Sequence, residues 1–253
     1  MRARLVSLWL TTSACAGPHR LPPDAAAELA QAAAPMGEPI YDGQVAPRGR
    51  EGPPLFRYQR QVMDAEGHVI SRHTTYSADG RAVLTHTSSH THGYDLTQFR
   101  EVHGQTGLVG QIDVQADGRA HYQITRGTRT TTRTEPAGAP LQTGPTLFGW
   151  ALAHWDALVA GEELPLRFVV LSKGRSYRFT LRRVAGEEGL VTLQLRPRSF
   201  FVALGVPRTV IVFDHDQRVV RYEGLVPPLE PVGRRLRPLD ATVTYTHRSA
   251  DYR

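Results

Sequence analysis

Three histidines carry the only residue pattern in this sequence that could bind a metal. His90 and His92 alternate along a stretch that reads as a strand, so their side chains would project to one face. With His103 as a third ligand they could hold a borderline ion such as zinc through imidazole nitrogen. No acidic residue stands at ligand spacing, and a solvated strand rich in serine and threonine explains the same residues. We therefore predict no metal and no cofactor.

Catalytic motifs are absent from the sequence. Asp214, His215 and Asp216 are neighbours in an expected turn, where side chains diverge toward water instead of converging in a pocket. The chain has no Gly-x-Ser-x-Gly elbow, no phosphate-cradling loop and no dinucleotide fingerprint. We predict that the protein is not an enzyme.

Large apolar side chains gather on and after one predicted helix, over about residues 145–160. Thr143-Gly144-Pro145 supplies its start and Gly161 its end. A curved sheet with a helix across its mouth can keep an interior that side chains do not fill, and then holds a ligand. A filled core is the alternative. The candidate cavity residues are Phe148, Trp150, Leu152, Trp155, Phe168 and Phe179.

A polar string, Arg221-Tyr222-Glu223-Gly224, is the most specific local pattern in the second half. On a strand, Arg221 and Glu223 share one face and Tyr222 points to the other. We expect an ion pair with a neighbouring strand, and a polar ligand contact is the alternative.

The elements around these residues are mainly strands. Apolar and polar residues alternate from Leu55 onward, and acidic-glycine turns at 64–67, 77–80 and 115–118 predict hairpins. Strands resume after the helix, and four prolines between 227 and 238 predict a loop before the last strand. We predict a mostly β fold, a curved antiparallel sheet or half-barrel of about 10–12 strands with one central buried helix.

The N-terminal residues have the layout of an export signal: two arginines, a short apolar run and several small residues. Thr12-Ser13-Ala14-Cys15 resembles the lipobox of bacterial lipoproteins, although that family prefers leucine where Thr12 stands. The resemblance implies that residues 1–14 are a signal peptide and that Cys15, the only cysteine, carries the lipid. Ala16, in place of aspartate, then implies the outer rather than the inner membrane. A plain cleaved signal and an incidental cysteine are the alternatives.

The rest of the chain divides into a tether and a domain. Residues 15–54 are rich in proline and alanine and predict a tether with one short helix near Asp24–Ala32. Residues 55–247 form the predicted β domain. The net charge of +6 is spread along the chain without a dense basic block, which argues against nucleic-acid binding.

The segment from about 144 to 245 resembles an uncharacterised family of Gram-negative bacterial proteins. The resemblance rests on Gly144-Pro145, Trp155-Asp156-Ala157-Leu158, Phe168-Val169-Val170, Arg178-Phe179-Thr180-Leu181-Arg182 and Arg221-Tyr222-Glu223-Gly224-Leu225. It implies no activity. In architecture alone, the predicted fold is also similar to the half-barrel carriers of lipoproteins. We expect a lipid-anchored, periplasm-facing envelope protein that binds a lipid or another apolar ligand. The alternative is a solid-core interaction protein that recruits an envelope partner through its sheet edge.

Overall fold

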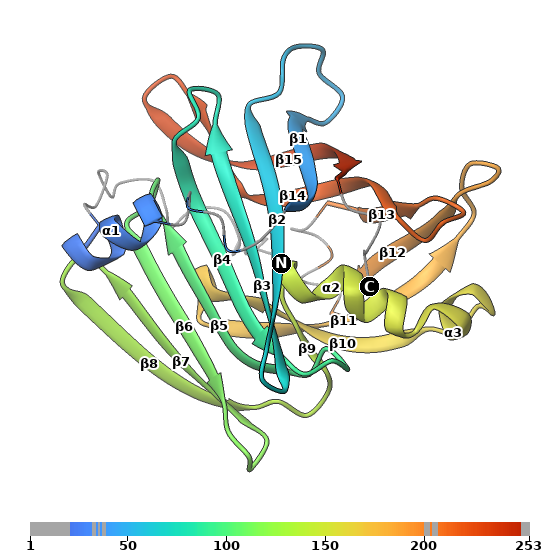
Figure 1. Cartoon of the computed structure of the whole chain (residues 1–253), viewed down its shortest axis with the longest axis horizontal. Helices are drawn as coiled ribbons and strands as arrows, with labels where there is room; N and C mark the ends of the chain where they lie inside the picture. Colours follow the sequence, from blue (N-terminus) through green and yellow to red (C-terminus); the bar gives the residue numbers. More distant parts are fainter. Residues whose placement is uncertain are drawn as a thin grey trace, which may run out of the picture.

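One sheet contains every strand in the part of the chain that the structure describes. This computed structural model describes residues 21–31, 34, 36, 39–199, 203 and 207–248. Its fifteen strands exceed the expected ten to twelve, and the mostly β fold is confirmed (Figure 1). The strands are β1 (Pro39–Pro47), β2 (Phe56–Ala65), β3 (His68–Ser77), β4 (Ala82–His90), β5 (Leu96–His103), β6 (Leu108–Val114), β7 (Arg119–Arg126), β8 (Arg129–Pro136), β9 (Leu141–Gln142), β10 (Leu164–Val170), β11 (Arg175–Val184), β12 (Val191–Pro197), β13 (Thr209–Phe213), β14 (Val219–Val232) and β15 (Arg235–His247).

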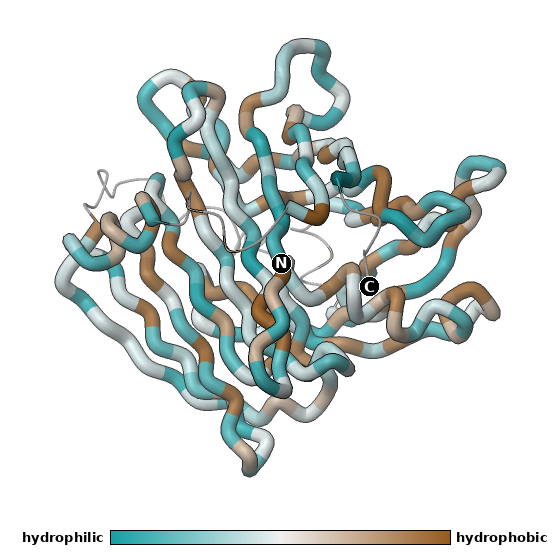
Figure 2. Tube along the Cα trace, in the orientation of Figure 1, coloured by the Kyte–Doolittle hydropathy of each residue, from teal (hydrophilic) through white to brown (hydrophobic). Residues whose placement is uncertain are grey.

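The sheet is an antiparallel meander with its two chain ends joined in the middle. Strands β1 to β8 pair in sequence, strands β10 to β15 pair in sequence, and β1 pairs with β15. The short strand β9 pairs with β10 in parallel. The sheet is not closed, because β8 and β9 are its two edges. Alternating hydropathy along the left-hand strands is visible in Figure 2 and follows the two-residue period of a pleated sheet.

Strand β1 lies inside the segment that the sequence predicted to be a tether. Tyr41 and Val45 are buried and alternate with more exposed residues, so this stretch has the pattern of a half-buried strand. Pro39 and Pro47 stand at its first and last positions, where a strand tolerates proline. The β domain therefore starts at Pro39 rather than at residue 55.

Strands β14 and β15 replace the loop that the prolines between 227 and 238 predicted. The two strands stay paired up to Val232 and Arg235, with one register shift between Val226 and Leu229. Pro227 and Pro228 lie at that shift, where an irregular ladder does not need their missing amide protons. The result is a long hairpin that ends at Gly233 and Arg234.

The predicted helix over 145–160 is divided in two. Helix α2 (Gly144–Ala153) and helix α3 (Trp155–Val159) meet at His154, which leaves the helical conformation at φ −115°. Its Nδ1 lies 2.9 Å from the carbonyl oxygen of Trp150, and this local side-chain bond competes with continuation of the helix. Helix α1 (Pro23–Gln31) precedes β1, and a short 3₁₀ turn, η1 (Leu171–Lys173), follows β10.

The sheet bends so that its two halves enclose the core, with α2 and α3 between them (Figure 1). The largest apolar cluster joins α2 and α3 to β1 and to strands β10 to β14. A second cluster joins residues of β5 to β7, such as Phe99, Ile112 and Tyr122, to Val169 of β10 and Leu171 of η1. Helix α1 covers the sheet elsewhere, packing Ala25 and Leu29 against Val102.

Glu135 links the two ends of the bent sheet. Oε1 of this β8 residue accepts hydrogen bonds from Tyr122 Oη (2.7 Å) and from the backbone nitrogen (2.9 Å) and Oγ (2.5 Å) of Ser176 on β11. Nη2 of Arg167 on β10 lies 3.2 Å from the same oxygen. Burial raises the pKa of Glu135, but the hydrogen bonds from Ser176 and Tyr122 outweigh burial and hold this pKa below its usual range. The carboxylate therefore stays ionised at neutral pH.

We expect Glu135→Gln to lower the free energy of unfolding by about 2 kcal/mol, because the amide keeps the size but removes the charge that Arg167 and the Ser176 donors face. Urea unfolding at pH 7 measures this difference. Glu162→Gln, at an exposed position, is the matched control and should change stability by less than about 0.5 kcal/mol. Equal stability of the two variants would contradict the role of Glu135.

Candidate functional site

A row of ionisable side chains crosses the inner face of the sheet. Strand register places Arg60 on β2 opposite His73 on β3, His73 opposite His86 on β4, and His86 opposite Glu101 on β5. All four side chains are buried. We call Arg60, His73, His86 and Glu101 the polar row. Such groups in a protein interior are uncommon, so this row is the first place to look for chemistry.

The hydrogen bonds of Arg60 fix the state of His73. Nη1 of Arg60 lies 3.1 Å from Nε2 of His73, and a guanidinium can only donate. Nε2 therefore accepts, and the proton of the neutral ring lies on Nδ1, which contacts the Tyr58 hydroxyl. Burial, the nearby charge of Arg60 and then His86 hold the pKa of His73 well below its usual range. Burial also raises the pKa of Tyr58. Both rings are thus neutral at physiological pH.

Ser71 and His90 form a serine–histidine pair beside the polar row. Ser71 Oγ lies 2.9 Å from His90 Nε2, and His90 Nδ1 lies 2.8 Å from the carbonyl oxygen of Thr91. A carbonyl only accepts, so Nδ1 carries the proton and Nε2 accepts from the hydroxyl. The geometry matches a nucleophile with its base. Both side chains are buried, however, and neither lines the surface hollows of about 320 and 470 Å³ among the described residues.

The polar row begins with the positive charge of Arg60 and ends with the negative charge of Glu101. His86 Nε2 lies 3.3 Å from Oε2 of Glu101. Burial raises the pKa of Glu101, but His86 outweighs burial and holds this pKa below its usual range. The row therefore runs from a guanidinium to a carboxylate across two imidazoles, which compensates its charge within the core.

The polar row and its neighbours hold the start of helix α2. Arg60 Nη1 donates to the carbonyl oxygen of Pro145 at 2.5 Å. Ser88 Oγ on β4 lies 2.9 Å from Oγ1 of the N-cap Thr143, and Thr146 Oγ1 accepts from the Thr143 backbone nitrogen at 2.9 Å. A polar helix terminus inserted into a sheet interior needs such partners. This explains why β2 to β5 carry polar side chains on their inner face.

The six predicted cavity residues lie in the apolar core. Phe148, Trp150 and Phe179 are buried members of the largest cluster, and Leu152, Trp155 and Phe168 pack against it. Phe148 and Trp155 both make edge contacts to Phe213, at ring centroid distances of 6.3 and 5.4 Å. Among the described residues, none of the six lines the surface hollows of about 320 and 470 Å³.

The three candidate metal ligands are not brought together. Strand β4 ends at His90, so His92 lies in the following turn, exposed and 3.2 Å from Asp64. His103 lies at the other end of β5, where its Nε2 donates to the Pro227 carbonyl oxygen at 3.2 Å. Among the described residues, no three histidine, cysteine, aspartate or glutamate side chains are placed to hold a metal.

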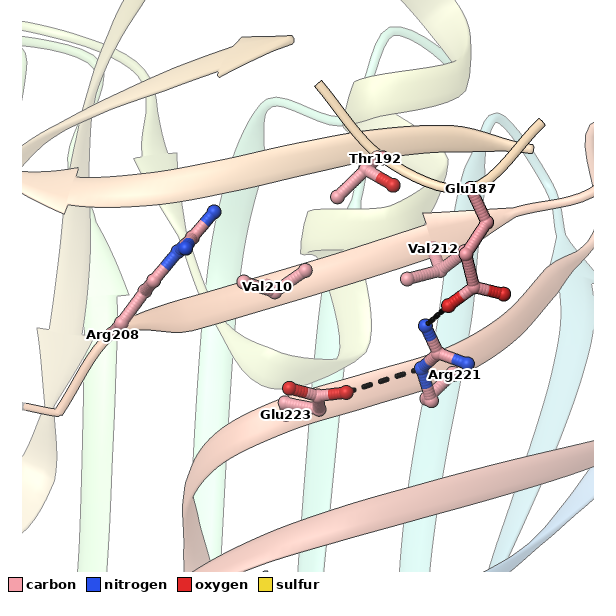
Figure 3. A pocket seen from close by; sticks show the side chains of 8 residues that line it. Glu187, Thr192, Arg208, Val210, Val212, Arg221 and Glu223 are labelled. Atoms are coloured by element: carbon pink, nitrogen blue, oxygen red, sulfur yellow. Dashed lines mark hydrogen bonds and ion pairs between the residues drawn. The ribbon is translucent and has the colours of Figure 1, made fainter. Parts of the chain in front are cut away.

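A shallow hollow of about 320 Å³ lies over the outer face of β12 to β14, around the Arg221-Glu223 pair (Figure 3). Arg221 is held between Glu223, 3.1 Å from its Nε, and Glu187 in the loop after β11. The expected ion pair is therefore within β14 and with a loop, rather than with a neighbouring strand. Tyr222 points to the opposite face and donates to the Leu225 carbonyl oxygen at 2.8 Å.

This outer hollow can hold a small polar molecule but offers no reactive pair. Its charged lining consists of Arg208, Arg221, Glu187 and Glu223, so its formal charges balance. No histidine, cysteine or serine lines it. A second hollow of about 470 Å³ shares Gly186 and Glu187 and extends to Val159 and Arg183.

Cys15, the predicted lipidation site, and the predicted signal peptide over 1–14 lie outside the described residues. Within the described residues, no helix combines the length and apolarity that crossing a membrane requires.

Comparisons with known proteins give little beyond the fold. No family model matches the sequence, and no curated protein matches it. A porin-like protein from Bacteroides uniformis is similar in structure over 85% of this chain and 99% of its own, at 12% identity and a TM-score of 0.21. What the two share is a large antiparallel sheet, and so weak a likeness carries no argument about function.

We did not predict the polar row from the sequence, although the pairing of Arg60 with His73 could have been found there. The predicted turn Asp64–Gly67 sets Ala65 opposite His68, and the antiparallel register then sets Arg60 opposite His73. The continuation to His86 was hidden by a register shift between Thr75 and Tyr76. The link to Pro145 joins segments far apart in the sequence.

We expect the free energy of unfolding to fall as the pH is lowered from 7.5 to 5.5. Burial lowers the pKa of His73, His90 and His103 in the folded chain, whereas unfolded histidine titrates near 6.5. The unfolded chain therefore binds more protons below about pH 6.5, and stability present above that pH is lost, by up to about 1.4 kcal/mol per pH unit for each histidine. Urea unfolding across this range measures the slope.

His73→Gln should reduce that slope, and His215→Gln, at an exposed turn position, should leave it unchanged. Equal stability of the parent protein at pH 7.5 and 5.5 would contradict the neutral state assigned to these rings.

Proposed function

We propose that this chain is a lipid-anchored protein of the bacterial cell envelope whose β domain is a solid-core scaffold for a protein partner. The anchor rests on the sequence: an export-signal layout followed by Cys15, the only cysteine. Ala16 after the cysteine favours the outer membrane and a periplasm-facing domain. A single acyl chain holds a protein weakly, so stable attachment needs the two or three chains that bacterial lipoproteins carry.

We propose a scaffold rather than a lipid carrier because the predicted cavity residues are packed against one another. A carrier needs an apolar space of at least about 300 Å³ beside the ligand-binding side chains. Here the aromatic side chains of α2 and α3 pack against one another and against Phe213. The hollow around Arg221 and its neighbour around Gly186 are open, lie elsewhere and include charged residues in their lining.

Edge strand β8 supports the choice of a protein as the partner. No other strand pairs with its outer side among the described residues, and seven of its eight residues are exposed. Backbone amides and carbonyls on a free edge can pair with an extended segment of another chain. Arg129 and Arg133 stand among four threonines there, which favours an acidic segment.

We expect the parent protein to incorporate radiolabelled palmitate in Gram-negative cells and to fractionate with membranes, because a thioether-linked lipid would retain it. Cys15→Ser should abolish the label, since no other thiol exists in the chain. Ala16→Ser, next to the cysteine, should keep it and serves as the control. Label that persists in Cys15→Ser, or an unlabelled parent protein, would contradict the anchor.

We also expect the detergent-extracted full chain to have the same mass under native and denaturing ionisation, apart from detergent. A filled core leaves no space for a ligand that survives purification. Lipid bound in stoichiometric amount under native conditions and lost on unfolding would contradict the scaffold and support a carrier.

A further inference from the structure

The tip of the β14–β15 hairpin is the most exposed apolar and basic element of the described chain. All eight residues from Pro231 to Pro238 are exposed, so neither face of the hairpin is covered there. Among the described residues, three large apolar side chains are exposed: Met63, Val232 and Leu236, at 38%, 38% and 44%. Two of the three therefore belong to this tip, which is drawn in orange-red at the upper left of Figure 1.

The tip also carries an uncompensated positive charge. Arg234, Arg235 and Arg237 lie within four residues, and no ion pair among the described residues involves them. The two acidic residues that flank the tip in the sequence are already paired. Glu230, which lies opposite Arg237 in the hairpin register, binds Arg50 at 2.6 Å, and Asp240 binds Arg48 at 2.7 Å. Arginines that flank exposed valine and leucine match a surface with anionic groups outside and apolar groups beneath.

The turn itself keeps these side chains projecting. Val232 pairs with Arg235 and Pro231 with Leu236, so a two-residue turn, Gly233-Arg234, closes the hairpin. Gly233 has a φ of +58°, which glycine adopts without strain. Pairing continues to the last residue before the turn, so the tip is a defined structure rather than a free loop.

The described chain also begins at this end of the sheet. Gln105, in the turn between β5 and β6, exchanges two 2.8 Å hydrogen bonds with the Leu229 backbone at the base of the hairpin. Helix α1 lies beside the same turn, because a Cβ on Gly104 would meet Leu29. Only five residues separate Cys15 from Leu21, and the six steps between their Cα atoms span at most about 20 Å. A lipid on Cys15 would therefore hold this end of the domain near the membrane.

We infer that the β14–β15 tip is a membrane-docking surface that binds anionic phospholipid headgroups through Arg234, Arg235 and Arg237 and inserts Val232 and Leu236 among them. The inference deepens the proposed function, since the lipid on Cys15 brings the tip to the bilayer. The tip would then fix the orientation of the sheet and turn edge strand β8 toward a partner.

A fluorophore at the tip tests this inference without the lipid anchor. In the full-length Cys15→Ser chain, Leu236→Cys provides a single thiol for an environment-sensitive dye. We expect a blue shift with phosphatidylcholine vesicles containing phosphatidylglycerol and none with pure phosphatidylcholine. The matched control is dye at Met63→Cys, a similarly exposed residue of the β2–β3 hairpin at the opposite end of the sheet, and it should not shift.

Arg234→Gln, Arg235→Gln and Arg237→Gln together should weaken partitioning about a hundredfold, since each arginine near an anionic surface contributes about fivefold. The same three changes at exposed Arg119, Arg129 and Arg178 should weaken it far less, and thermal unfolding shows whether both triple variants remain folded. No shift at Leu236, an equal shift at Met63, or an equal loss in both triple variants would overturn the inference.

The two proposals can fail separately. Palmitate incorporation decides the anchor, and the dye decides the docking surface in a chain that cannot be acylated at Cys15. A labelled parent protein with no dye shift at Leu236 would overturn the docking surface alone.

Discussion

The contact on which the fold depends is the one that Glu135 makes across the gap between the two ends of the sheet. Fifteen strands in one open meander bury little unless the sheet bends and covers itself. The carboxylate of β8 bonds the backbone of Ser176 and faces Arg167, so both halves meet over the cluster that includes Phe99 and Val169. In that cluster, Val169 and Leu171 cover apolar residues of β5 to β7, and the Glu135 contact holds the two halves together beside it.

The polar interior and the apolar core are two consequences of inserting a helix between those halves. The side of α2 that faces β10 to β14 is apolar and packs Phe148 and Trp150. Its first turn faces β2 to β4, where Arg60 and Ser88 bind Pro145 and Thr143. The buried serine–histidine pair has the geometry of a catalytic dyad, but its burial and the role of its neighbours in holding α2 favour structure over chemistry.

Local patterns in the sequence predicted most of the strands and several turns, because alternation and acidic-glycine pairs act within a few residues. Tyr41 and Val45 show the same alternation, but the prolines around them outweighed it in our interpretation and β1 was missed. Pro227 and Pro228 misled in the same way, since a register shift that accommodates them cannot be seen in one strand alone. The polar row needed the register of four strands, and the link from Arg60 to Pro145 depends on how the sheet bends. Aromatic residues near the helix fit a cavity or a core equally well in sequence, and only packing distinguishes the two.

The pairing of β1 with β15 determines when the sheet can finish folding. Tyr41 lies opposite His247, so the centre of the sheet joins the first and last strands of the domain. Contacts this distant in the chain form slowly, and β1 to β8 alone leave the outer edge of β1 unpaired until β15 takes its place. Synthesis from the N-terminus therefore leaves the sheet incomplete until its last strand has emerged. In the export that we propose, the chain would pass unfolded through a translocation channel, and this delay would keep it competent for transport until it reaches the far side of the membrane.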